Sequence, residues 1–323
     1  MKCVVTGAAG FIGSHLCERL LALGHEVHGV DAFIPYYSPD VKKHNLTTAQ
    51  ANPRFHFHAI DLRRDPLTPV LRGAEIVFHL AAMPGLTRSW HDFDLYESCN
   101  VTATQRLLEA LRQCDPRPRK LVHASTSSVY GRTANGNEDQ PTRPISPYGV
   151  TKLAAENLVL AYADAFGLPV VILRYFSVYG PRQRPDMGYH QFIEAMLTGR
   201  PIVVTGDGHQ VRGNTFIADC VGATIAAADA PNGSIYNVGG GESASVWDIL
   251  RRLEKLAGRP ANVQLAPARP GDQRHTLADS TRLARDLGWK AATSLDDGLA
   301  QQWQWQAEVL RTGSASPSHS PTS

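Results

Sequence analysis

Short runs of β-branched and other apolar residues alternate along this chain with longer segments in which apolar residues recur at helical spacing. The apolar runs at 2–6, 25–31, 75–81, 119–125 and 169–176 predict strands. The segments 11–23, 97–114 and 146–166 predict the helices between them. Because nearly continuous apolar strands separated by amphipathic helices are typical of a parallel sheet covered on both faces, the pattern predicts a doubly wound α/β fold.

The pattern changes from about residue 180, where the chain becomes richer in Pro, Gly and loops. The predicted helices there are shorter, at 245–257 and 280–288, and we expect a smaller second lobe. From Thr312 the sequence "TGSASPSHSPTS" has no large apolar residue to offset its ordering entropy. Residues 312–323 are therefore expected to form a disordered tail.

Composition narrows the class of protein. The 32 Lys and Arg residues nearly balance 30 Asp and Glu residues, so the net charge of +2 gives no reason to expect binding to nucleic acid or to an anionic membrane. No apolar run reaches about 18 residues and no signal peptide is evident, so no membrane span is expected. The five cysteines are odd in number and scattered, which favours free thiols in a reducing, cytoplasmic setting: Cys3, Cys17, Cys99, Cys114 and Cys220.

A glycine-rich turn joins the first predicted strand to the first helix. In "VVTGAAGFIGSHL" the residues Gly7, Gly10 and Gly13 permit a tight turn and let backbone N–H groups approach a pyrophosphate at a helix N-terminus. Asp31 ends the second strand, where an acid can accept hydrogen bonds from ribose hydroxyls. An acid there repels a 2′-phosphate, so the pattern predicts NAD rather than NADP. Asp61, after the third strand, either reaches adenine or is a solvated loop acid.

A second set of residues suggests proton transfer. Tyr148 and Lys152 in "SPYGVTK" are four apart and share one face of a helix. A tyrosine pKa near 10 must fall by about 3 units, roughly 4 kcal/mol, for it to act as a base at neutral pH, and a nearby ammonium can contribute. One hydroxyl of the strand-end stretch "HASTSSVYG" can bond the same substrate oxygen. The candidates are Ser125, Thr126, Ser127 and Ser128.

The ordered motifs of this chain resemble those of the extended short-chain dehydrogenase/reductases, specifically the NAD-dependent nucleotide-sugar epimerases and dehydratases. The resemblance runs from Lys2 to about Trp303 through "TGAAGFIGSHL", "HLAA", "STSSVYG", "YGVTK", "RYFSVYGP", "GDGHQVR", "YNVGGGE" and "RPGD". It implies a Rossmann-type NAD-binding domain at 1–176 and a mainly UDP-sugar-binding α/β domain at 177–311, with residues of about 212–238 returning to the first domain. It also implies a homodimer formed through helices that include the Tyr148 helix.

The resemblance also implies roles for individual residues. Tyr148 is the expected base, Lys152 tunes it and holds the nicotinamide ribose, and Thr126 is the hydroxyl partner. The expected NAD contacts are Gly7, Gly10, Phe11, Ile12, Gly13, Asp31, Asp61, Leu62, Leu80, Ala81, Ala82, Ser125, Tyr148, Lys152, Tyr175 and Val178. The expected substrate contacts are Thr126, Ser127, Ser128, Ser177, Arg184, Gly188, Phe192, Arg212, Arg269 and Asp272.

The residues after Thr126 distinguish activities within the family. Related 4,6-dehydratases have an Asp-Glu pair where this chain has Ser127 and Ser128, because elimination needs an acid and a base. UDP-glucuronate decarboxylases tend to have a glutamate in place of Ser128. Neither carboxylate is present, so the resemblance favours epimerisation at C4.

The stretch "GPRQRPDM" bears on the sugar, since it resembles the pattern of UDP-glucuronate 4-epimerases, in which a loop arginine meets the C6 carboxylate. That role is assigned to Arg184, with Arg182 as second choice; the alternative is that these arginines face solvent or assist the diphosphate. A UDP-glucose 4-epimerase, a UDP-glucuronate decarboxylase and a non-catalytic NAD-binding module stay open as alternatives. His79 and His123 are expected in the core, and no metal-ligand spacing is seen.

Overall fold

The computed structural model describes residues 1–267 and 275–313. Within them the main sheet has seven strands, all parallel, which confirms the doubly wound α/β prediction. In spatial order the strands are β12 (Ser234–Val238), β7 (Val170–Tyr175), β5 (Lys120–Thr126), β4 (Ile76–His79), β1 (Lys2–Thr6), β2 (Glu26–Val30) and β3 (Phe55–His58).

Helices cover both faces of this sheet because successive side chains of each strand point to opposite sides. Val5 packs in one buried cluster with Leu16 and Cys220, whereas Val4 packs in another with Leu107. The helices and helical turns of this part are α1 (Phe11–Ala22), α2 (Pro39–Asn45), α3 (Thr47–Gln50), α4 (Thr68–Leu71), η1 (Arg88–Trp90), α5 (Phe93–Glu97), η2 (Ser98–Thr102), α6 (Ala103–Arg112), η3 (Ser127–Tyr130), α7 (Pro147–Phe166), α9 (Ile217–Ala226), η4 (Ala227–Asp229) and α11 (Thr281–Leu287).

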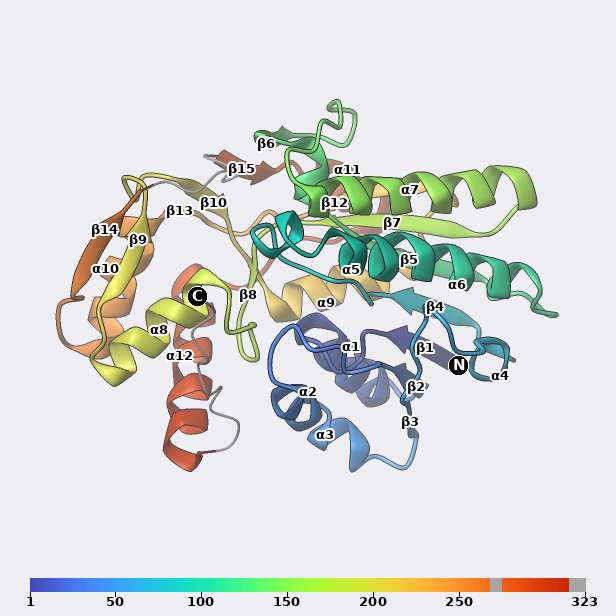
Figure 1. The fold of residues 1–323 in the computed structure, drawn as a ribbon, viewed down its shortest axis with the longest axis horizontal. Helices are drawn as coiled ribbons and strands as arrows, with labels where there is room; N and C mark the ends of the chain where they lie inside the picture. Colours follow the sequence, from blue (N-terminus) through green and yellow to red (C-terminus); the bar gives the residue numbers. More distant parts are fainter. Residues whose placement is uncertain (268–274, 314–323) are drawn as a thin grey trace.

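The remaining elements form a smaller lobe beside the carboxyl ends of the main strands, on the left in Figure 1. Its strands pair as β9 with β14, as β8 with β11, and as a sheet in the order β13, β10, β15, β6. The elements are β6 (Thr133–Gly136), β8 (Val178–Tyr179), α8 (Gly188–Thr198), β9 (Ile202–Thr205), β10 (Val211–Gly213), β11 (Thr215–Phe216), β13 (Ser243–Ser245), α10 (Val246–Ala257), β14 (Val263–Ala266), β15 (His275–Ala278) and α12 (Leu295–Thr312).

The chain crosses between the two parts more than once. After β10, helix α9 packs on α1, and β12 extends the main sheet beside β7. The sheet of the small lobe in turn takes β6 from the segment between β5 and α7. Strand β6 lies within the first 176 residues of the chain. Its pairing with β15 nevertheless places it in the sheet of the small lobe.

The predicted start of the tail, Thr312, is too early in the sequence. Thr312 is the last residue of α12, its hydroxyl donates to the Glu308 carbonyl over 2.9 Å, and Gly313 caps the helix in the left-handed conformation. The Ser- and Pro-rich composition did not predict that α12 continues to Thr312, where the helix and its cap satisfy the backbone groups. Residues 314–323 lie outside the described part of the chain.

All five cysteines are described, and all are free thiols, as the sequence predicts. Among the described residues no helix combines the length and apolarity that crossing a membrane requires.

Candidate active site

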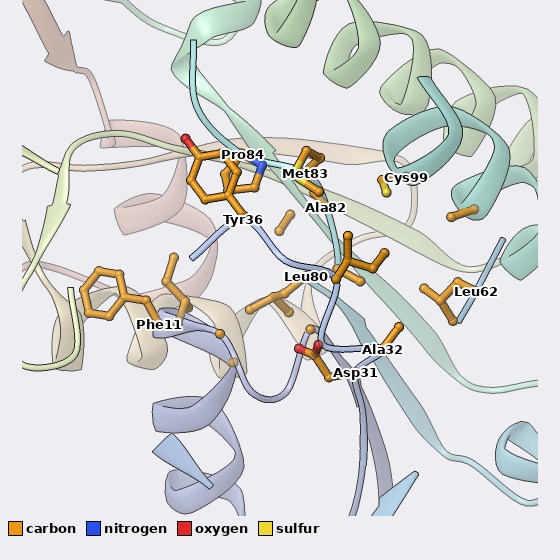
Figure 2. A pocket seen from close by; sticks show the side chains of 18 of the residues that line it. Phe11, Asp31, Ala32, Tyr36, Leu62, Leu80, Ala82, Met83, Pro84 and Cys99 are labelled. Atoms are coloured by element: carbon orange, nitrogen blue, oxygen red, sulfur yellow. The ribbon is translucent and has the colours of Figure 1, made fainter. Parts of the chain in front are cut away.

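A pocket opens at the carboxyl ends of β1 and β4, where the order of strands reverses and doubly wound sheets bind their ligands. Figure 2 shows Phe11 and Leu62 toward opposite sides of this pocket, with Asp31 and Leu80 between them. Of the predicted NAD contacts all except Val178 line it: Gly7, Gly10, Phe11, Ile12, Gly13, Asp31, Asp61, Leu62, Leu80, Ala81, Ala82, Ser125, Tyr148, Lys152 and Tyr175. Val178 is buried in β8.

The glycine turn leaves no room for side chains. Gly7 has a φ of +72°, and a Cβ on it would lie 2.8 Å from the Ala81 nitrogen of the neighbouring strand end. A Cβ on Gly13 would lie 2.1 Å from the Gly7 carbonyl oxygen, so α1 begins directly against the turn. The turn therefore presents bare backbone at the N-terminus of a twelve-residue helix, where N–H groups can approach a pyrophosphate.

Asp31 is held rigidly at the end of β2. Its Oδ2 accepts from the Ala9 N–H over 3.2 Å and its Oδ1 from the Phe33 N–H over 2.8 Å. The Lys42 ammonium lies 3.8 Å from Oδ1 and donates to the Ile34 carbonyl. The glycine cradle and this fixed acid together match the diphosphate and ribose of NAD.

Asp61 also reaches the pocket, but its carboxylate is engaged. Arg63 donates to it through Nε and Nη2, the latter over 2.8 Å, and Arg64 lies 3.3 Å away. These bonds lower the pKa of Asp61, with the Arg63 hydrogen bond as the largest cause. Recognition of adenine by this carboxylate stays a prediction, and it requires that the oxygens be shared with Arg63.

Helix α7 places Tyr148 in the pocket from its first turn. The Ser146 hydroxyl caps the helix by accepting from the Gly149 N–H over 3.1 Å, and Pro147 occupies the first helical position. A Cβ on Gly149 would lie 2.8 Å from the Ser128 carbonyl oxygen, so the helix start packs against the turn that follows β5. This contact brings Tyr148 to Thr126.

Burial and hydrogen bonding act in opposite directions on the phenol. Burial raises the pKa of Tyr148, whereas its hydrogen bond with Thr126 and the positive charge of Arg184 lower it. One turn along α7, burial lowers the pKa of Lys152 to about 8, and its ammonium donates to the Ala124 carbonyl over 2.7 Å. The predicted trio of Thr126, Tyr148 and Lys152 is thus assembled around one end of the pocket.

A buried ionic network lies behind these residues. Glu156, one turn beyond Lys152, accepts from Arg174 of β7 through both carboxylate oxygens, with Nη2 to Oε2 at 2.7 Å. The Ser125 hydroxyl donates to the same carboxylate. Arg174 also donates to the Tyr130 hydroxyl over 2.9 Å. The network ties α7 to β5 and β7 directly beneath the trio.

Arg184 lines the pocket together with Tyr148 and Lys152. Its Nε and Nη2 donate to the two oxygens of Asp186, each over 2.9 Å, and its guanidinium lies 5.6 Å from the centre of the Tyr36 ring. Tyr36 in turn donates to Asp186 over 3.1 Å, and the Arg88 guanidinium lies 5.5 Å from the centre of the same ring. Although burial opposes it, the Asp186 carboxylate raises the pKa of Arg184.

Arg182, the second choice for a substrate carboxylate, lies elsewhere. Its Nη2 donates to Glu18 over 2.8 Å and its Nη1 to the Ser14 hydroxyl, both on α1. Its backbone is left-handed, with a φ of +64°. Of the two loop arginines, only Arg184 lines the pocket.

Of the other predicted substrate residues, those that the structure describes lie outside the lining of this pocket. Thr126 caps η3 by accepting from the Ser128 N–H over 3.2 Å, and Ser127 follows it in that turn. Gly188 begins α8 near the ring of Phe192. The remaining members are Ser177 before β8 and Arg212 in β10; Arg269 and Asp272 lie outside the described residues.

His79 and His123 are core residues, as expected. His79 is hydrogen-bonded to the hydroxyls of Thr6 and Thr104, at 2.8 and 3.0 Å. Burial lowers the pKa of both histidines, so both are neutral. Neither lines the pocket.

Four pocket residues with hydroxyl or charged side chains were missed by the sequence reasoning: Tyr36, Tyr37, Lys42 and Arg63. Tyr36 and Lys42 belong to the loop and helix that follow Asp31, a stretch without periodic pattern. The two tyrosines in "FIPYYSPD" directly after the acid were the available signal, because exposed aromatics in a loop often contact ligands.

Comparison with known proteins agrees with this geometry. A protein of Bacillus subtilis named as an uncharacterised UDP-glucose epimerase is 44% identical over 94% of this chain and 96% of its own length. A UDP-glucuronate 4-epimerase of Thermodesulfobacterium geofontis is 36% identical over 95% of this chain and 96% of its own. The crystal structure of a UDP-glucuronic acid 4-epimerase from Bacillus cereus, in complex with UDP-glucuronic acid and NAD, is 42% identical with a TM-score of 0.92, covering 96% of this chain and 100% of that one.

The description "NAD dependent epimerase/dehydratase family" fits residues 3–239, a stretch that contains the glycine turn, Asp31, Thr126, Tyr148, Lys152 and Arg184. The match covers more than half of the chain and agrees with the relatives in both sequence and fold. This chain is a member of the NAD dependent epimerase/dehydratase family.

Proposed function

We propose that this protein is a UDP-glucuronate 4-epimerase, which interconverts UDP-glucuronate and UDP-galacturonate. The observation that supports this best is the presence of Arg184 in the same pocket as Tyr148 and Lys152. The serines at 127 and 128 supply no carboxylate for elimination at C5 and C6. Inversion at C4 needs only oxidation and reduction at that carbon, and for this a base and a redox cofactor suffice.

Tyr148 removes the proton of the 4-hydroxyl and later returns one to the 4-keto oxygen. NAD, held by the glycine turn and Asp31, supplies the redox chemistry at C4. Thr126 is hydrogen-bonded with the phenol and holds the same sugar oxygen. Lys152 lies one helical turn away, and its positive charge favours the phenolate.

Arg184 orients the substrate carboxylate. Nε and Nη2 are engaged by Asp186, and Nη1 has no acceptor among the described residues, so this nitrogen is available to a carboxylate oxygen. After oxidation at C4 a uronic acid becomes a β-keto acid, which loses CO2 when the carboxylate bond aligns with the carbonyl π system. A guanidinium that fixes the carboxylate out of that alignment protects the intermediate until reduction is complete.

A second candidate is UDP-glucose 4-epimerase, and the Arg184–Asp186 pair favours it. The pair already neutralises the guanidinium, which reduces the selectivity for an acid over a neutral hexose. The name of the Bacillus subtilis relative agrees with this candidate. UDP-glucuronate is preferred because Nη1 lacks a protein acceptor in the described part of the chain and the bound crystal relative at 42% identity was solved with this sugar.

We further propose that the site is divided between the two parts of the chain. Residues 1–176 hold NAD, and 177–311 mainly hold the UDP-sugar, with Ser127, Ser128, Ser177, Gly188, Phe192 and Arg212 around the sugar and diphosphate. The protein is proposed to be a cytoplasmic homodimer. Exposed apolar side chains near α5 and α7 support this assembly: Trp90, Phe93, Val150 and Phe166.

Product analysis tests the activity. The purified, NAD-loaded protein is incubated separately with UDP-glucuronate and UDP-glucose, and the UDP-sugars are separated by chromatography. We expect UDP-galacturonate from the first incubation, without UDP-pentose. Turnover of UDP-glucose alone would show that the second candidate is right, and no turnover of any UDP-sugar by a folded, NAD-loaded protein would support a binding module.

A further inference from the structure

One cluster of titratable side chains lies outside the pocket lining, with its nearest members two positions before Val30 and Ile60 of that lining. Glu26 and His28 belong to β2, and His56 and His58 belong to β3, the edge strand at the lower right of Figure 1. Residues two apart on a strand share a face, and His28 pairs in register with His56. The four side chains therefore gather on one face of two neighbouring strands.

Three of these side chains present metal-ligating atoms to a common point. Glu26 Oε1 lies 2.9 Å from His28 Nε2 and 3.5 Å from His56 Nε2, and all three atoms lie within 4.8 Å of one another. With bonds of about 2.0–2.1 Å, a tetrahedral zinc ion holds its ligand atoms about 3.3 Å apart. Two of the three separations are already close to this value. The third separation joins Nε2 of His28 and Nε2 of His56. Because Glu26 and His56 are exposed and His28 is half-buried, small side-chain rotations bring this separation to the same value.

His58 completes the set as an orienting partner. Its Nε2 lies 2.9 Å from His28 Nδ1, and the two rings stack at 5.1 Å with an interplanar angle of 10°. When Nε2 of His28 ligates a metal, its Nδ1 carries the proton and donates to His58. Metal-bound histidines are commonly fixed through the other ring nitrogen in this way.

The charged groups beside the cluster are compatible with a bound cation. Lys2 lies beside Glu26 on the adjacent strand, and its ammonium donates a hydrogen bond to the Arg72 carbonyl over 2.8 Å. Glu26 provides the single carboxylate of the cluster.

We propose that Glu26, His28 and His56 form a binding site for a divalent transition-metal ion of the zinc class, oriented by His58. Imidazole and carboxylate ligands suit zinc, nickel, cobalt and copper, whereas magnesium and calcium prefer oxygen alone. The ion replaces the proton between His28 Nε2 and Glu26, and water occupies the fourth position. It ties β3 to β2, whose continuations contribute Asp61 and Asp31 to the pocket.

The test uses the full-length, NAD-loaded protein without a histidine tag, stripped with EDTA and dialysed. Isothermal titration with ZnCl2 is expected to give one site per chain, together with a rise in melting temperature. The substitutions His28→Gln and His56→Gln are each expected to weaken zinc binding at least tenfold, and His58→Asn about tenfold. MgCl2 is expected to give neither heat nor stabilisation.

His25→Gln is the matched control. His25 directly precedes β2 and lies near Glu75 and Arg119 rather than in the cluster, so zinc binding is expected to be unchanged. Cobalt(II) provides a separate readout, because its visible absorption reports a four-coordinate site in the wild type and not in the double variant His28→Gln/His56→Gln. Equal zinc binding by wild type and the double variant, or no binding by either, would overturn the proposal.

Discussion

At the scale of single residues, the proposed function assigns to Arg184 the choice of sugar, because this arginine lines the pocket. It is held by both oxygens of Asp186 and by the face of Tyr36, and Tyr36 lines the pocket with it. Such a guanidinium is preorganised, so little rotamer freedom is lost when a substrate carboxylate binds. Its positive charge also lowers the pKa of Tyr148, which couples recognition of the acid to the proton transfer.

Arg184→Ala is expected to lower kcat/KM for UDP-glucuronate by about tenfold to a hundredfold, the worth of one charge-assisted contact. It is also expected to raise the fraction of UDP-pentose among the products, because the carboxylate of the 4-keto intermediate is no longer fixed. Chromatography of the products measures both effects.

Arg251→Ala provides the control for this experiment. Arg251 is exposed on α10 and pairs only with Asp248 of its own helix among the described residues, so rate and product ratio are expected to be unchanged. If Arg184→Ala epimerised UDP-glucuronate at the wild-type rate without UDP-pentose, the assigned role would be wrong.

The sequence predicted the residues that belong to motifs, and it missed those that depend on tertiary contact. Asp31, Tyr148 and Lys152 occupy defined places at strand ends and helix starts, so their spacing, together with the neighbouring motifs and the family resemblance, locates them. Tyr36 reaches Arg184 across 148 positions of the chain, through a loop whose course no periodicity reveals. The preference for Arg184 over Arg182 came from the family resemblance; the ion pair of Arg182 with Glu18 gives it a physical reason.

At the scale of elements, α7 holds Tyr148 and Lys152 against the sheet. Glu156 and Arg174 are almost completely buried, at 1% and 5% exposed, and form a bidentate pair. Removing one member of such a pair leaves an uncompensated charge in the interior. The helix holds its position against β5 and β7 through this pair and through Ser125.

Glu156→Gln is therefore expected to lower the free energy of unfolding by about 3–5 kcal/mol, since Arg174 loses its counter-ion. Urea unfolding followed by circular dichroism measures the loss. Glu109→Gln, which removes a carboxylate that pairs with Arg112 at the surface of α6, is the matched change and is expected to cost much less. A similar cost for both variants would contradict the structural role of the buried pair.

The turn between β1 and α1 makes a second prediction at this scale. Gly13→Ala places a methyl group 2.1 Å from the Gly7 carbonyl oxygen, so the turn must move and the phosphate-binding geometry is lost. We expect the purified variant to contain less than a tenth of the NAD found in wild type, measured by absorbance after denaturation. Gly222→Ala in α9 is the control, because its backbone is not left-handed and a Cβ there comes no closer than 3.7 Å to any atom, the Trp289 Nε1. Full NAD content in Gly13→Ala would contradict the assignment of this turn.

At the scale of the whole molecule, local pattern predicted the main sheet but not the connections of the small lobe. The strands of the main sheet are continuous apolar runs, which periodicity detects. The pairing of β15 with β6 joins short polar segments 142 positions apart, His275 with Thr133, and these strands form only because the two parts of the chain meet. Side-chain pattern in either segment alone contains no such information.

The buried Lys152 affects the stability of the whole fold. Its folded pKa of about 8 lies below the unfolded value near 10.4, so between these values the unfolded chain binds more protons and stability rises with pH. Below pH 8 both states are protonated and the cost of burying the charge is fully present. Relative to Lys152→Met, NAD-stripped wild type is expected to gain up to about 3 kcal/mol of unfolding free energy between pH 8 and 10.5.

Urea unfolding at a series of pH values measures this difference. Lys43→Met, at an exposed lysine of α2, is the control, and its difference from wild type is expected to stay constant with pH. A constant difference for Lys152→Met as well would show that the ammonium is not buried in the folded protein.

The central claim is that C4 of a UDP-uronic acid is inverted by removal and return of the same hydrogen. The most direct test is to equilibrate UDP-glucuronate with the NAD-loaded protein in D2O and to examine the products by NMR and mass spectrometry. The account predicts UDP-galacturonate without deuterium at C4 or C5. Solvent deuterium at either carbon, or the absence of UDP-galacturonate, would contradict it.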